Sequence, residues 1–297
     1  MHADLPPTER REDAAAELDL LPTDALVAHL LQRSFIAFDA ARANASAIAG
    51  AVERAAELVR VGGRLHYAGA GTSGRIAALD AAELAPTFGV ASDFACMHLA
   101  GGERALRRAI EGAEDDARTG ADEVAACVRA GDVLLALSAS GRTPYTVAAV
   151  LAARERGAFT VALTADADAP LAHAAESVIA LETGAEPLAG STRMNAATAQ
   201  KLALNAFSTA LMVRLGRVLG NRMVGVVPLN AKLRVRAVRL VEELTGLPRE
   251  RAEDLLARAG GEVRVAVVMG VRGLAPNDAR AVLDACGGDL RAAIARR

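Results

Sequence analysis

Five short apolar segments, separated mostly by helix-like stretches, constrain the fold of this chain more than any other feature. The segments span residues 64–69, 94–100, 132–138, 159–164 and 177–182. Apolar runs of this length without polar alternation are typical of strands buried on both faces. Helical patterns occupy 74–84, 103–129 and 143–156. Strands that alternate with helices predict a three-layer α/β sandwich with a central parallel sheet.

The segments that flank this region are predicted to be helical. Residues 1–22 contain three prolines and are expected to form an extended arm, and residues 23–60 show apolar residues at helical spacing. After Pro187 we expect no further strands, one long helix over 191–219 and another near 229–244. The expected domains are therefore 1–244 and a small all-helical domain over 245–297, with four short helices separated by glycine turns.

Composition and charge exclude several classes of protein. The chain has 297 residues, 52% of them hydrophobic, and its 34 basic and 36 acidic residues leave a net charge of −2. Only 3% of residues are aromatic, so neither a basic nucleic-acid surface nor a base-stacking platform is expected. The N-terminus lacks a signal-peptide pattern, and no apolar run is long enough to span a membrane. We therefore expect a cytoplasmic protein that binds neither nucleic acid nor membrane.

The cysteines and histidines show no metal-binding spacing. Cys96, Cys127 and Cys286 lie far apart in the sequence, and we interpret them as free thiols. No H-x-x-x-H pair is present, and His66 and His98 fall in predicted strands, where packing is the simpler role. The sequence predicts no metal site and no cofactor.

A glycine-rich loop follows the first predicted strand. Gly69-Ala70-Gly71-Thr72-Ser73-Gly74 matches G-x-G-x-x-G, a spacing that lets the backbone approach a phosphate at a helix start. A dinucleotide site also needs a carboxylate at the end of the second strand, but that strand ends in the apolar sequence MHLAGG. Gly71, Thr72 and Ser73 are therefore candidates for binding a phosphate monoester.

Hydroxyl groups also gather in two later segments. Ser138, Ser140 and Thr143 follow the third predicted strand, before Pro144 at a helix start. Ser191 and Thr192 stand at the expected start of the long helix, where an ordinary N-cap is an equal alternative. Ligands of open α/β sheets bind at the carboxyl ends of the strands, so we predict that these hydroxyls bind phosphate.

Five segments together resemble one enzyme family, the N-acetylmuramic acid 6-phosphate etherases. The resemblance is carried by YAGAGTSGRIAALDAAELAPTFG, AIEGAEDDA, SASGRTPY, AGSTRMNAATAQKLALNAFST and NAKLRVRAVRLVEELTG, in this order over nearly the whole chain. It implies a sugar isomerase-type phosphosugar-binding domain, a ubiquitin-associated-like helical tail, and a homodimer with its active site near the subunit interface. It also implies a role in recycling cell-wall sugars.

The same resemblance implies two catalytic carboxyl groups. Glu83 falls one or two turns past the first loop and matches the family's proton donor, with a pKa expected to be raised by burial. Glu114 matches a second active-site glutamate, which we expect to be the base. The reaction would eliminate D-lactate from the sugar and add water, leaving N-acetylglucosamine 6-phosphate. A phosphosugar isomerase and a non-catalytic phosphosugar-sensing regulator remain alternatives.

Overall fold

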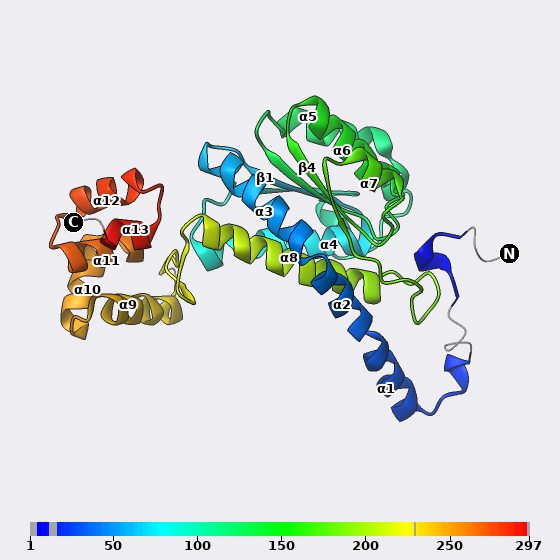
Figure 1. Cartoon of the computed structure of the whole chain (residues 1–297), viewed down its shortest axis with the longest axis horizontal. Helices are drawn as coiled ribbons and strands as arrows, with labels where there is room; N and C mark the ends of the chain where they lie inside the picture. The colour runs from blue at the N-terminus through cyan, green and yellow to red at the C-terminus, as the bar shows by residue number, and fades with distance from the viewer. Residues whose placement is uncertain (1–4, 12–16, 229, 296–297) are drawn as a thin grey trace. The chain divides into compact units, whose positions relative to one another are not determined.

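The computed structural model describes residues 5–11, 17–228 and 230–295, and the statements below concern these residues. A parallel sheet of five strands has the order β2-β1-β3-β4-β5 (Figure 1). The strands are β1 (Leu65–Gly69), β2 (Ala95–Leu99), β3 (Val133–Leu137), β4 (Phe159–Thr164) and β5 (Ser177–Ala180). All five coincide with the predicted apolar segments. The α/β class is therefore confirmed.

Helices cover both faces of this sheet. One face packs against α5 (Ala117–Cys127), α6 (Pro144–Glu155) and α7 (Pro170–Ala174), seen above the sheet in Figure 1. The other face carries α3 (Ala45–Arg60), α4 (Gly71–Phe88) and α8 (Asn195–Arg214). Strand residues alternate between the two layers: Ala68 and Leu134 meet α5 and α6, while the Tyr67 hydroxyl donates to Asp80 on α4. The three-layer prediction is confirmed.

Two predicted helices are interrupted. Residues 103–129 form η4 (Glu103–Leu106), η5 (Ala113–Asp115) and α5, because Gly112 adopts a left-handed conformation that ends helical geometry. Of the stretch 191–219, only α8 is helical, and Gly216 has a φ of +69°. The chain then forms a short hairpin, β6 (Val218–Leu219) with β7 (Arg222–Met223), so the prediction of no strands after Pro187 was wrong.

The N-terminal helical region is divided into three helices. They are α1 (Thr23–Arg33), α2 (Phe35–Ala43) and α3, with breaks at Ser34 and Asn44. The preceding arm contains η1 (Pro7–Glu9) and η3 (Leu18–Leu20), and part of it lies outside the described residues. Thr8 is fully buried, and its carbonyl accepts a hydrogen bond from the Gly190 amide at 3.1 Å. The arm is thereby attached to the loop before α8.

The chain divides into two compact units, residues 1–81 with 95–208, and residues 82–94 with 209–297. The helices of the second unit are α9 (Ala231–Thr245), α10 (Arg249–Arg258), α11 (Val263–Arg272), α12 (Pro276–Ala285) and α13 (Leu290–Ala295). They share one apolar core with the hairpin, so the C-terminal region is all-helical apart from β6 and β7. The domain boundary between 244 and 245 stays a prediction. No helix among the described residues has both the length and the apolarity needed to cross a membrane.

Candidate active site

The loops that follow β1, β2 and β3 begin side by side at one edge of the sheet. Gly69, the last residue of β1, is paired with Leu99 at the end of β2 and with Leu137 at the end of β3. The strands are parallel, so their carboxyl ends share this edge. Three segments therefore leave the sheet next to one another. They are the first loop (the glycine-rich residues 69–74), the acidic segment 100–116, and the serine-rich loop 138–143.

The three glycines of the first loop have different physical roles. A Cβ on Gly74 would lie 2.7 Å from the Gly69 carbonyl oxygen and 2.4 Å from Leu99 Cδ1. Gly69 and Gly74 thus allow the strand and helix to pack closely. Gly71 has a φ of +53° and open space around it, and it starts α4. An 18-residue helix begins there. The unpaired amides at its start and the positive end of its dipole favour the binding of an anion.

A pocket of about 310 Å³ joins this loop to the acidic segment after β2. Its polar lining comes from Gly71, Thr72, Arg75, Glu111 and Glu114. The structure therefore brings Glu114 to the same cavity as the first loop, although the two are distant in sequence. Glu114 is exposed on η5, so its carboxylate is open to solvent in the single chain.

Arg75 is a candidate residue that the sequence analysis missed. It is the fifth residue of α4, and its Nε donates a 2.8 Å hydrogen bond to the Ala105 carbonyl oxygen. This bond holds a guanidinium in the pocket beside Gly71 and Thr72. The only sequence signal was a basic residue directly after the G-x-G-x-x-G motif.

Hydrogen bonds connect the first loop to the serine-rich loop through α8. Ser73 is buried, and its hydroxyl donates to Gln200 Oε1 at 2.9 Å. Gln200 Nε2 contacts the Leu163 carbonyl oxygen at 3.4 Å, and the same carbonyl accepts the Ser138 amide at 3.2 Å. Ser73 and Ser138 therefore both lie at the carboxyl ends of the strands, as the phosphate-site hypothesis requires.

The three hydroxyls after β3 form one cluster. Ser138 Oγ lies 2.8 Å from Thr143 Oγ1 and 3.5 Å from Ser140 Oγ, and it accepts the Gly141 amide at 3.0 Å. Gly141 has a φ of +65°, and a Cβ there would lie 2.6 Å from Thr164 Oγ1. The tight turn thus brings the three hydroxyl groups together at the start of α6.

Ser191 and Thr192 do not begin α8. The helix starts at Asn195, and the buried carboxylate of Glu186 accepts the amides of Asn195 and Ala196 at 2.7 and 2.9 Å. Two of the amides at this helix end are therefore already satisfied by the chain itself. Ser191 and Thr192 lie half-buried in the preceding turn, near the arm rather than at an open helix terminus.

Glu83 is placed differently from what its assigned role requires. It lies about three turns along α4 from Gly71, rather than one or two, and it is exposed. The burial expected for a proton donor is absent in the single chain, because this part of α4 presents Glu83 to solvent. Glu83 is not among the residues that line the 310 Å³ pocket.

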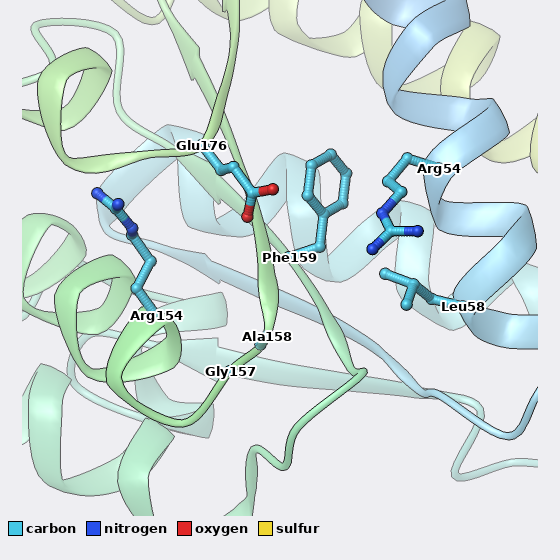
Figure 2. A pocket seen from close by; sticks show the side chains of 7 residues that line it. All are labelled: Arg54, Leu58, Arg154, Gly157, Ala158, Phe159 and Glu176. Carbon is cyan, nitrogen blue, oxygen red and sulfur yellow. The ribbon is translucent and has the colours of Figure 1, made fainter.

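A second cavity lies at the opposite edge of the sheet, where β4 begins. It measures about 280 Å³ and is lined by Arg54, Arg154, Phe159 and Glu176 together with Leu58, Gly157 and Ala158 (Figure 2). Two of its arginines are engaged, since Arg54 pairs with Glu57 at 2.9 Å and Arg154 donates to the Ala174 carbonyl at 2.7 Å. None of the predicted site residues lines this cavity.

Comparison with known proteins identifies the family. The chain is 51% identical, over 88% of its length and 86% of the relative, to an N-acetylmuramic acid 6-phosphate etherase from Thermobifida fusca. It is 46% identical to the etherase of Deinococcus radiodurans, over 96% of this chain and 93% of that protein. The chain belongs to the N-acetylmuramic acid 6-phosphate etherase family. The resemblance stated from the sequence is confirmed.

Domain and structural matches agree with the fold of this family. Residues 47–154 match the glucokinase regulatory protein N-terminal SIS domain, and residues 114–210 match the SIS domain. A phosphoheptose isomerase structure from Francisella tularensis superposes with a TM-score of 0.50 at 20% identity, over 64% of this chain and 98% of that chain. At this identity, the likeness shows that the etherase-family chain has a sugar isomerase-type fold.

Proposed function

We propose that this enzyme cleaves the lactyl ether of N-acetylmuramic acid 6-phosphate during the recycling of cell-wall sugars. The products are N-acetylglucosamine 6-phosphate and D-lactate. The observation that carries the proposal is the pocket in which Glu114 meets Gly71, Thr72 and Arg75, in a chain that belongs to the etherase family. An anion-binding loop and a carboxylate in one cavity are what elimination from a phosphosugar needs.

The phosphate is bound at the carboxyl ends of β1 and β3. The start of α4 supplies amides near Gly71, and Thr72 supplies a hydroxyl. The cluster of Ser138, Ser140 and Thr143 supplies further hydroxyls. Contacts of Gln200 with Ser73 and with the Leu163 carbonyl oxygen hold the two loops near each other. Anchoring the phosphate orients a flexible open-chain sugar for reaction. Ser191 and Thr192 contribute from the turn before α8.

The carboxyl groups perform the proton transfers. In the open-chain sugar, the aldehyde at carbon 1 acidifies the proton on carbon 2, which Glu114 removes. Glu83 protonates the lactyl oxygen as its bond to carbon 3 breaks, and water then adds to the unsaturated aldehyde at carbon 3. Each proton transfer contributes about 10²–10⁴-fold to the rate. Neither step requires a metal or a redox cofactor.

Replacing Glu114 tests the base. Glu114→Ala should lower solvent deuterium exchange at carbon 2 by at least about 100-fold, because the carboxylate in the pocket is lost. Glu155→Ala, which removes an exposed glutamate at the end of α6, serves as the matched control and should retain exchange. Undiminished exchange in the Glu114 variant would exclude it as the base.

Replacing Glu83 tests the acid. Glu83→Ala should still bind N-acetylglucosamine 6-phosphate, because the phosphate loops are intact, but lactate release should fall by about 100-fold or more. A coupled lactate assay and calorimetry measure the two properties separately. Full lactate release would remove Glu83 from the mechanism, whatever the result for Glu114.

We propose that the enzyme is a homodimer whose active site is completed at the subunit interface. Support comes from an apolar stripe along α1 and α2, in which Val27, Leu31, Phe35 and Phe38 are each about half exposed or more. Their spacing places Val27 and Leu31 on one face of α1, and Phe35 and Phe38 on one face of α2. Neighbouring exposed apolar side chains of this kind mark protein interaction sites. A second subunit would also supply the cover that Glu83 lacks.

The phosphosugar isomerase and the non-catalytic regulator use the same loops. An isomerase would convert an aldose phosphate to a ketose phosphate without releasing lactate, and a regulator would bind the sugar without changing it. Lactate release from N-acetylmuramic acid 6-phosphate by the purified protein distinguishes the etherase from both. We place this activity in the cytoplasm, where cysteine thiols stay reduced and disulfides are rare.

A further inference from the structure

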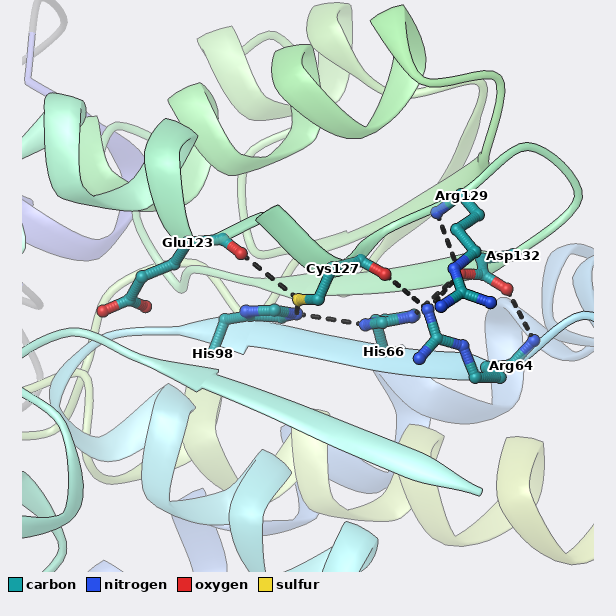
Figure 3. A network of polar contacts seen from close by, with 7 residues as sticks. All are labelled: Arg64, His66, His98, Glu123, Cys127, Arg129 and Asp132. Carbon is teal, nitrogen blue, oxygen red and sulfur yellow. Dashed lines mark hydrogen bonds and ion pairs between the residues drawn. The ribbon is translucent and has the colours of Figure 1, made fainter. Parts of the chain in front are cut away.

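A buried cluster of two histidines and a cysteine lies between the sheet and α5. His66 on β1 is fully buried, His98 on β2 is 5% exposed, and Cys127 is the last residue of α5. His66 Nδ1 lies 3.1 Å from His98 Nε2, and Cys127 Sγ lies 3.9 Å from the same nitrogen (Figure 3). Three potential ligand atoms, all within 4.8 Å of one another, thus converge from three elements.

These distances match the spacing of ligands around a small tetrahedral ion. Zinc bonds of about 2.0–2.1 Å to nitrogen and 2.3 Å to sulfur place neighbouring ligand atoms roughly 3.3–3.6 Å apart. The two separations measured from His98 Nε2, 3.1 and 3.9 Å, lie within about 0.3 Å of that range, and all three atoms lie within 4.8 Å of one another. Histidine and cysteine together are the ligands that zinc prefers in proteins.

The surroundings hold one histidine in the orientation that a ligand needs. His66 Nε2 lies 3.1 Å from Asp132 Oδ2, which leaves Nδ1 directed at His98. Asp132 is itself fixed, because it accepts the amides of Arg64 and Arg129 at 2.8 and 3.0 Å and pairs with the Arg64 guanidinium at 3.0 Å. A carboxylate that orients a histidine from behind is the usual outer partner of a zinc ligand.

The thiol of the cluster is positioned by its own helix. Cys127 Sγ contacts the Glu123 carbonyl oxygen, one turn earlier on α5, at 3.2 Å. A metal ion would displace the thiol proton to solvent and bind the thiolate.

We propose that His66 Nδ1, His98 Nε2 and the Cys127 thiolate bind one zinc ion. The ion would tie α5 to β1 and β2 on the face of the sheet that α5 covers. None of the three residues lines the 310 Å³ pocket, so the site is separate from the pocket of the proposed reaction. No metal site was expected from the sequence, because these residues are distant in sequence and only strand pairing and helix packing bring them together.

Cobalt binding tests the ligand set directly. Full-length protein, freed of metal with a chelator and kept in a phosphine reductant that prevents disulfides, is titrated with Co²⁺. We expect one ion per chain, with visible tetrahedral bands and a near-ultraviolet thiolate-to-cobalt band. Cys127→Ser should remove the thiolate band and weaken binding at least about tenfold. Cys286→Ser changes a half-buried thiol in the second compact unit and should retain both properties.

Thermal unfolding with zinc provides the second measurement. At a free zinc concentration about 100 times Kd, Tm should rise by about 5–10 °C, and His98→Gln should abolish the rise. Asp132→Asn should weaken zinc binding by about 10–100-fold. Circular dichroism of each metal-free variant shows whether it is folded, and His98→Gln decides the question if Cys127→Ser does not fold. Absence of stoichiometric binding, or unchanged binding in both ligand variants, would overturn the proposal.

Discussion

At the scale of single residues, a buried carboxyl group supports the first loop from behind. Asp80 on α4 accepts hydrogen bonds from the Tyr67 hydroxyl at 2.8 Å and from Ser208 Oγ at 3.0 Å. Burial raises the pKa of Asp80 above its ordinary value, and the two hydrogen bonds and the Lys201 charge only partly oppose this. The arrangement ties β1, α4 and α8 together behind the glycine-rich loop.

The raised pKa of Asp80 makes a prediction about stability and pH. The folded state binds this proton more tightly than the unfolded chain does, so the contribution of Asp80 to the free energy of unfolding falls as pH rises above about 4. Asp80→Asn keeps an acceptor for Tyr67 and removes the titration. Urea unfolding between pH 4 and 7 should therefore show a smaller loss of stability with rising pH in the variant. Identical pH profiles would contradict the assignment.

At the scale of elements, the close contact between β1 and α4 decides which glycines are needed. A Cβ on Gly74 would lie 2.7 Å from the Gly69 carbonyl oxygen, and this backbone atom has no room to move. Gly74→Ala should therefore destabilise the fold by about 1–3 kcal/mol, measured by urea unfolding.

Gly50 provides the matched control within a helix. It lies in α3, and nothing is within 4 Å of its added Cβ, so Gly50→Ala should stabilise the protein by about 0.5–1 kcal/mol. Equal effects of the two substitutions would show that the strand-to-helix turn relaxes easily.

At the scale of the whole molecule, the apolar stripe on α1 and α2 predicts self-association. Phe35 and Leu31 are 64% and 65% exposed in the single chain, and α1 has no buried residue. The double change Leu31→Glu and Phe35→Glu should convert a dimer into monomers in analytical ultracentrifugation, and lactate release should fall with it. Val61→Glu alters an isolated residue that is 83% exposed and should leave the dimer intact. A wild-type protein that is monomeric at micromolar concentration would contradict the interface.

Much of the fold follows from local patterns in the sequence. The apolar runs marked all five strands of the parallel sheet, because strands buried on both faces need uninterrupted apolar residues. The hydroxyl-rich loops were recognisable because each follows a strand and precedes a helix. Helix interruptions were missed at Gly112 and Gly216, where a single backbone conformation outweighs favourable helical residues on either side.

The sequence by itself determined the class of fold, the five strands of the parallel sheet, and the loops in which hydroxyl groups gather. Only the tertiary structure decided which distant residues meet, because strand register and helix placement depend on packing between elements far apart in the chain. It placed Glu114 and Arg75 in one pocket, linked Ser73 to Gln200, and left Glu83 exposed. It also brought His66, His98 and Cys127 together beneath α5. The spacing of these three residues in the sequence did not indicate a site.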